Sequence, residues 1–182
     1  DGFRKSFSAG GLVKEAEAFL GDKLPEMIEE IAAQGRDFDA IVLLDKHREI
    51  LLPKQKDSSF LIHLADCMNR LGLMKRAAKI YLFLLENYRD KEEEKYFYLP
   101  LVNTYMERQE YSAAADFSGR YLERFPEGRD WQDLYYLQMR AYRKAELFDD
   151  AITAWKKNRG RADDRVRMVA AQVFWEKKRY QD

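Results

Sequence analysis

Four alanines are evenly spaced at 37 residues along this chain. They are Ala40, Ala77, Ala114 and Ala151, and the residues around them are similar from one occurrence to the next. A constant period of this length is typical of repeat proteins, in which each repeat is one supersecondary unit that stacks on the next. The period predicts an open array of similar units, because no single unit of this size buries its apolar face alone.

Each unit has the pattern of two helices. Before Ala77, the residues Leu61, Leu64 and Met68 recur at three- and four-residue steps, which is the spacing of one helical face. Gly72 then stands where a glycine commonly ends a helix. No segment alternates as a strand would. We therefore expect an all-α protein, an α-solenoid of about four and a half helical hairpins.

The period also predicts where the units begin and end. We expect an N-terminal capping helix in residues 1–20, carrying Leu12, Ala16, Phe19 and Leu20, because the end of a solenoid needs a polar outer face. The last connection is about five residues shorter than the others, since Tyr180 follows Phe148 by only 32 positions. The expected units lie near residues 21–57, 58–94, 95–131, 132–163 and an incomplete 164–182.

Two features test the predicted helices. The periodic alanines are expected at helix–helix contacts, because two helices approach closely only where one of them carries a small side chain. Pro100 interrupts an otherwise helical pattern and would be best tolerated in a first turn. The helix therefore either starts near Leu99 or is kinked at Pro100. We favour the late start, after a partly solvated connector at residues 90–95 that includes the exposed run Glu92-Glu93-Glu94.

These hairpins resemble the tetratricopeptide repeat (TPR), whose pattern has large apolar, Leu-Gly, Tyr, Ala, aromatic and Pro positions. The unit at 95–131 departs from it at Ser118, where an aromatic residue is expected, and the 37-residue period exceeds the usual 34. The same unit matches the pattern at Tyr98, Leu101, Val102, Tyr105, Ala114 and Pro126. The resemblance implies a right-handed α-solenoid, a superhelix whose first helices line a concave face that takes up a peptide or a helix.

Candidate partner-binding residues lie one step away from the apolar positions of these first helices. Tyr, Trp and Arg are the residue types that contribute most to binding energy at protein interfaces. Some members of the family clamp a C-terminal carboxylate with Lys and Asn; Asn103 stands where one such Asn would, but the other positions carry Ile62, Pro100 and Leu137, so no clamp is expected. The predicted partner-binding residues are Asn69, Arg70, Asn103, Met106, Tyr136, Arg140, Arg143, Lys144 and Trp175.

Other chemistry finds little support in the sequence. His63 and Cys67 are four residues apart but lack further ligands for zinc, and we expect Cys67 to pack between helices with His63 facing solvent or the groove. No catalytic residues, cofactor site or phosphate-binding loop are expected. The formal net charge of zero argues against nucleic acid. No apolar run is long enough to span a membrane, and the single cysteine leaves both cytoplasm and periplasm open.

The sequence therefore predicts a protein–protein interaction scaffold, a segment of a larger assembly protein, for which family habit suggests a bacterial envelope or secretion system. Residues 129–182 hold 13 Lys/Arg and 9 Asp/Glu, which favours an acidic partner. One alternative is self-assembly, a homo-oligomer that stacks through an apolar edge at Val169, Val173 and Phe174. A second alternative is a regulatory repeat domain of a larger enzyme.

Overall fold

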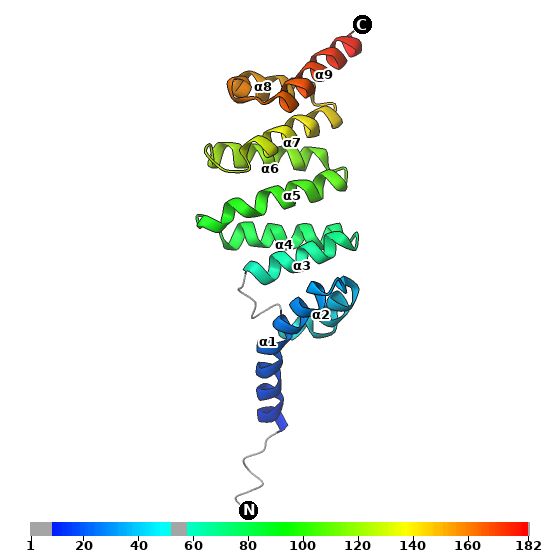
Figure 1. The fold of residues 1–182 in the computed structure, drawn as a ribbon, viewed down its shortest axis with the longest axis vertical. Coiled ribbons are helices and arrows are strands. Elements are labelled where there is room, and N and C mark those ends of the chain that lie inside the picture. The colour runs from blue at the N-terminus through cyan, green and yellow to red at the C-terminus, as the bar shows by residue number, and fades with distance from the viewer. Residues whose placement is uncertain (1–8, 52–57, 182) are drawn as a thin grey trace, which may run out of the picture. The chain divides into compact units, whose positions relative to one another are not determined.

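The computed structural model describes residues 9–51 and 58–181, and these residues form helices and turns without a strand (Figure 1). Two short 3₁₀ helices, Glu92–Glu94 and Arg159–Arg161, lie between α-helices. The α-helices are α1 (Ala9–Ala33), α2 (Asp37–Leu51), α3 (Ser58–Arg70), α4 (Met74–Asn87), α5 (Lys95–Glu107), α6 (Tyr111–Arg124), α7 (Trp131–Lys144), α8 (Phe148–Asn158) and α9 (Asp164–Gln181).

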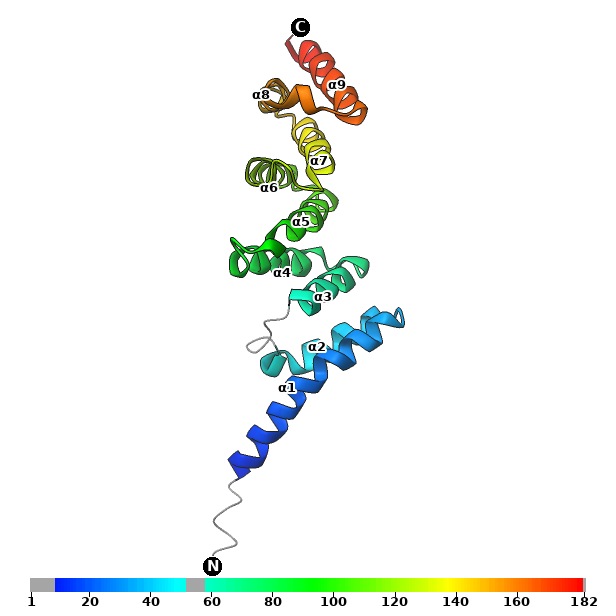
Figure 2. The same cartoon turned by 60° about the vertical axis from the view of Figure 1, so that its left-hand side comes forward.

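The chain divides into two compact units, residues 1–80 and residues 81–182. In the first unit, α1 and α2 pack as a hairpin and α3 contacts both of them. In the second unit, each of α5 to α8 packs against the helix that follows it, and α7 also contacts α5 and α9. The helices α5, α7 and α9 thus form one column and α6 and α8 the other (Figure 2). The expected all-α solenoid of TPR-like hairpins is confirmed.

The periodic alanines are core residues, as predicted. Ala40, Ala77, Ala114 and Ala151 each have 0% of their surface exposed. Ser118, which replaces the aromatic residue expected after Ala114, is also fully buried, and its hydroxyl donates a hydrogen bond to the Ala114 carbonyl at 2.8 Å. The small Ser118 side chain allows the helices to approach closely. Its hydroxyl is bonded within its own helix, so no buried polar group is left unpaired.

The turn inside each of the four hairpins is built in the same way. Gly35, Gly72, Gln109 and Glu146 all have a positive φ, and they are again 37 residues apart. At the second turn, the Gly72 N–H bonds to Asn69 O and the next N–H bonds to Met68 O, and the other three turns repeat both bonds. This is the Schellman arrangement that ends a helix with one left-handed residue.

These turns give a direct stability prediction. Gly72→Ala is expected to lower the free energy of unfolding by about 1 kcal/mol, because a side chain is disfavoured at φ +73 although no atom lies within 4 Å of the new Cβ. Conversely, Gln109→Gly is expected to raise the free energy of unfolding by about 0.5 kcal/mol. Glycine removes the left-handed strain, and the greater entropy of glycine in the unfolded chain offsets part of this gain. Urea unfolding measures the change in the free energy of unfolding for each variant. If both changes had the same sign, the left-handed conformation of these two residues would be contradicted.

The capping helix expected in residues 1–20 is not a separate element. Helix α1 is continuous from Ala9 to Ala33, so Leu12, Ala16, Phe19 and Leu20 belong to the first helix of the first hairpin. Gly10, Gly11 and Gly21 lie inside it, because a glycine ends a helix only where the chain turns into the left-handed conformation, as it does at Gly35.

The prediction of a late helix start before Pro100 is wrong. Helix α5 begins at Lys95, and Pro100 lies inside it. The Thr104 hydroxyl donates to the Pro100 carbonyl at 2.8 Å, one turn further on. Residues 92–94 form a 3₁₀ helix that leads directly into α5, so the helical segment is extended on the N-terminal side of the proline.

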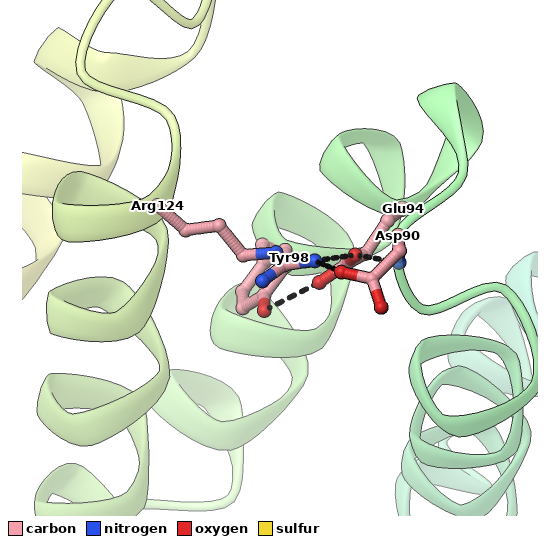
Figure 3. Close-up of polar contacts among 4 residues, drawn as sticks. All are labelled: Asp90, Glu94, Tyr98 and Arg124. Carbon is pink, nitrogen blue, oxygen red and sulfur yellow. Dashed lines mark hydrogen bonds and ion pairs between the residues drawn. The ribbon is translucent and has the colours of Figure 1, made fainter.

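The connector before α5 is also less solvated than expected. Glu92 and Glu93 are exposed, but the side chain of Glu94 is only 4% exposed. Figure 3 shows Arg124 of α6 reaching this carboxylate, with an N–O distance of 2.9 Å, and pairing with Asp90 as well. The Asp90 amide and the Tyr98 hydroxyl donate to Glu94 at 2.7 and 3.2 Å. Three donors, from the turn, α5 and α6, therefore meet at one buried carboxylate.

The apolar edge predicted on the C-terminal helix is mostly buried. Val169 and Val173 are buried within the second unit, so they form no open stacking edge. Phe174 is 45% exposed, and α9 continues to Gln181. The valines are covered because α9 packs on both α7 and α8.

Candidate interaction surface

Three neighbouring helices of the second unit present equivalent residues on one face. Positions i, i+4 and i+7 of a helix share a side, and equivalent positions are 37 residues apart from α5 to α7 and 32 apart from α7 to α9. The ion pair between Asp133 and Arg165, at 3.0 Å, joins two such equivalent positions and supports this register. The face, called here the α5–α7–α9 face, consists of Leu99, Asn103, Met106, Tyr136, Arg140, Arg143, Met168, Gln172 and Trp175, none of which is buried.

Tyr136 lies on α7, the middle helix of this face, and two guanidinium groups lie over its ring. The Cζ atoms of Arg140 and Arg165 are 5.4 and 5.2 Å from the centroid of its ring. Arg165 is held by Asp133 and by Asp163, the latter at 2.9 Å, and these pairs raise its pKa. Cations over a ring face are attracted by its quadrupole, so the ring and the two arginines form one amphipathic surface.

Arg143 is bound within the chain. Its Nε lies 3.0 and 3.1 Å from the two carboxylate oxygens of Glu176, and a second nitrogen lies at 2.8 Å, which is a bidentate pair between α7 and α9. Arg70 of α3, in the first unit, makes a similar pair with Asp37 at 2.6 Å. These bonds raise the pKa of both arginines and lower that of Asp37. Both predicted binding residues therefore also hold neighbouring helices together.

The remaining predicted residues differ in exposure. Trp175 is 61% exposed, Asn103 and Lys144 are exposed, and Met106 is half-buried. Asn69 is half-buried on α3, and it and Arg70 belong to the first unit, whereas the other seven predicted residues belong to the second. The structure thus gathers six predicted residues on the α5–α7–α9 face, with Lys144 at the end of α7.

The predicted residues did not include Leu99, Met168 and Gln172 of this face, nor Arg165 beside it. Met168 is 58% exposed and occupies the position equivalent to Tyr136, while Arg165 covers the ring of Tyr136 from α9. The shortened last connection hides both, since a 37-residue step from Tyr136 leads to Val173 instead. A step of 32 residues, the same interval that separates Phe148 from Tyr180, would have found Met168.

Cys67 and His63 follow the sequence interpretation. Cys67 is buried, burial raises the pKa of its thiol to about 11, and Arg70 donates to its sulfur at 3.2 Å. His63 is exposed, with Nδ1 at 3.2 Å from a Glu29 oxygen. Among the described residues, no group of three or more His, Cys, Asp and Glu side chains is arranged to hold a metal ion. None of the helices in that part of the chain is long and apolar enough to cross a membrane.

Solved structures share this arrangement of helices. A MamA structure labelled AMB-1 is 20% identical, with a TM-score of 0.60 over 90% of this chain and 90% of that one. A second MamA structure, labelled MSR-1, is 18% identical, with a TM-score of 0.57 over 90% and 87%. A Podosopora anserina putative kinesin light chain with TPR-like repeats is 12% identical, with a TM-score of 0.59 over 91% and 90%. No family model and no curated protein matches the chain. These likenesses show a TPR-type helical repeat fold.

Proposed function

We propose that this chain is a protein-interaction scaffold and that its α5–α7–α9 face binds one segment of a partner protein. The observation that carries the proposal is the composition of that face: it has Tyr136, Trp175, two methionines and two arginines, and no carboxylate at its nine positions. Aromatic residues, Met and Arg are enriched at protein interfaces. The fold supports the proposal by analogy only, because the same fold carries different functions.

The chemistry of the face indicates the kind of segment it would take. Met168 and Trp175 lie two turns apart on α9 and are more than half exposed, so they offer apolar area to an anchoring side chain. Arg140 lies beside them on α7 and would face a carboxylate of the partner. An extended or helical segment with an apolar anchor and a nearby acidic residue fits this pattern.

The test uses the double substitution Met168→Ala and Trp175→Ala. After capture of a partner from the native organism and mapping of the bound segment, the Kd of a synthetic copy of that segment is expected to rise at least about tenfold, because exposed aromatic anchors dominate binding energy. Phe83→Ala is the matched control, since Phe83 lies on α4 in the same unit and is 45% exposed. An unchanged Kd in the double variant, or an equal loss in the control, would overturn the assignment of this face.

Self-assembly is the second candidate, and the exposed Met168, Phe174 and Trp175 on α9 favour it. In that case the segment bound would belong to a second copy of this chain. Sedimentation velocity over a concentration series separates the two candidates: an oligomer that the double variant abolishes supports self-assembly, and a monomer at high concentration excludes it.

A further inference from the structure

We propose that a pocket in the first unit binds an acidic peptide that inserts one apolar side chain. The pocket lies between α2, α3 and α4 and has a volume of about 450 Å³. It is distinct from the α5–α7–α9 face, because all of its residues belong to residues 1–80. The lining residues of this α2–α4 pocket are Leu44, Asp45, Arg48, Leu64, Met68, Arg76, Lys79 and Ile80.

The floor of the pocket is apolar and firmly held. Leu44, Leu64 and Met68 are core residues of α2 and α3, each with less than 4% of its surface exposed, and Ile80 of α4 is half-buried beside them. A rigid floor of this kind loses little side-chain entropy when a ligand covers it. The volume falls within the range of small-ligand pockets, so it accommodates an aliphatic side chain with part of its backbone.

The rim of the pocket has an excess of positive charge. Arg76 makes a two-pronged pair with Asp45, one N–O distance being 2.9 Å, and this pair lowers the pKa of Asp45. Arg48 and Lys79 are exposed, and neither forms an ion pair among the described residues. Three cations thus face one carboxylate around an apolar floor. A ligand that complements this surface has carboxylates on both sides of an apolar group.

Related pockets occur in the second unit, and their lining residues carry a smaller excess of positive charge or none. One lies between α4 and α6, where Arg120 pairs with Asp116 and Arg124 pairs with Asp90 and Glu94. The other lies between α6 and α8, where Lys157 pairs with Glu123 at 2.8 Å across the pocket. The repeat therefore produces a pocket of this kind between successive second helices, and of these three the α2–α4 pocket has the largest excess of positive charge around its apolar floor.

Peptide fits the α2–α4 pocket better than nucleic acid does. A phosphate backbone would pair with Arg48 and Lys79 but would leave the apolar floor facing water. Residues 1–80 contain 13 Lys/Arg and 13 Asp/Glu, so the positive charge is local to the rim and does not extend over the unit. Binding of a polyanion depends on an extended basic surface.

The experiment uses the full chain and a fluorescein-labelled peptide with a central leucine flanked by three aspartates on each side. Fluorescence anisotropy is expected to show binding that weakens as salt increases. The double substitution Arg48→Glu and Lys79→Glu is expected to raise the Kd at least about tenfold, since two attractions become repulsions. The matched control is Lys46→Glu with Lys75→Glu, which makes the same change in net charge on the same two helices outside the pocket.

Several outcomes would overturn the proposal. Equal losses in the two double variants would mean that only net charge matters, and equal binding of a peptide with serine in place of leucine would remove the apolar anchor. Tighter binding of a single-stranded oligonucleotide of equal charge, lost in the same variant, would assign the pocket to nucleic acid. Met168→Ala with Trp175→Ala is expected to leave this Kd unchanged, so failure here is distinguishable from failure of the proposed α5–α7–α9 function.

Discussion

Replacing Arg124 with alanine is expected to lower the free energy of unfolding by about 3 kcal/mol. The substitution leaves the buried Glu94 carboxylate without its cation, and an uncompensated buried charge costs about 3–5 kcal/mol. We expect the lower end of this range, because the Arg124 side chain is 34% exposed and water partly replaces it. The Asp90 amide and the Tyr98 hydroxyl remain as donors. Urea unfolding followed by circular dichroism measures the change.

Two further variants separate this explanation from simple loss of an ion pair. Lys157→Ala breaks the ion pair with Glu123, which has the same 34-residue spacing as the pair of Arg124 and Asp90. Because Lys157 and Glu123 are both largely exposed, the substitution is expected to lower the free energy of unfolding by less than about 1 kcal/mol. Adding Glu94→Gln to Arg124→Ala is expected to recover about 1 kcal/mol or more, because the buried charge is then removed. Equal losses for Arg124→Ala and Lys157→Ala would contradict the role of burial.

The same cluster has a consequence at high pH. Burial and the Glu94 carboxylate raise the pKa of Tyr98 to about 12. The neutral hydroxyl therefore remains a donor to Glu94 well above neutral pH. Because the pKa is raised on folding, this contribution to stability is complete below about pH 10 and is lost as the pH rises toward 12.

The repeat was predictable from the sequence because its cause is local. Ala40 and its equivalents are small wherever two helices touch, and Gly35 and Gly72 end helices through their own backbone preference. Gln109 and Glu146 adopt the same left-handed conformation without a glycine. There the packing of the following helix imposes the turn, and the residue type does not reveal it.

The polar contacts were not predictable in the same way. Glu94 resembles its exposed neighbours Glu92 and Glu93 in sequence, and it is buried only because Arg124, 30 residues later, reaches it. Arg143 likewise pairs with Glu176 across 33 residues. Which polar side chains pair depends on the register between neighbouring helices. A period of 37 residues followed by one of 32 does not define this register. The α9 part of the candidate face depends on the same register, since Met168 is found from Tyr136 only with the 32-residue step.

Gly128→Ala is expected to lower the free energy of unfolding by about 2–3 kcal/mol, through overpacking that forces shifts of backbone or side chain. A Cβ added at this turn would lie 2.2 Å from the Tyr121 hydroxyl oxygen, 2.8 Å from its ring carbon Cζ and 3.0 Å from the Phe125 carbonyl oxygen. Tyr121 is fully buried and packs against Tyr98 and Phe125, so its ring does not move aside freely. The cause is steric, because the φ of Gly128 lies outside the left-handed region.

The steric cause makes a sharper prediction possible. Tyr121→Phe removes the oxygen atom with the shortest contact, so Gly128→Ala is expected to cost about 1 kcal/mol less in that background than in the wild type. Gly160→Ala is the matched control, since no atom lies within 4 Å of its added Cβ, and it is expected to change stability by less than about 0.5 kcal/mol. Additive effects of the Gly128 and Tyr121 substitutions would show that the two residues do not share this contact. The close approach of Tyr121 would then not explain the cost of a side chain at position 128.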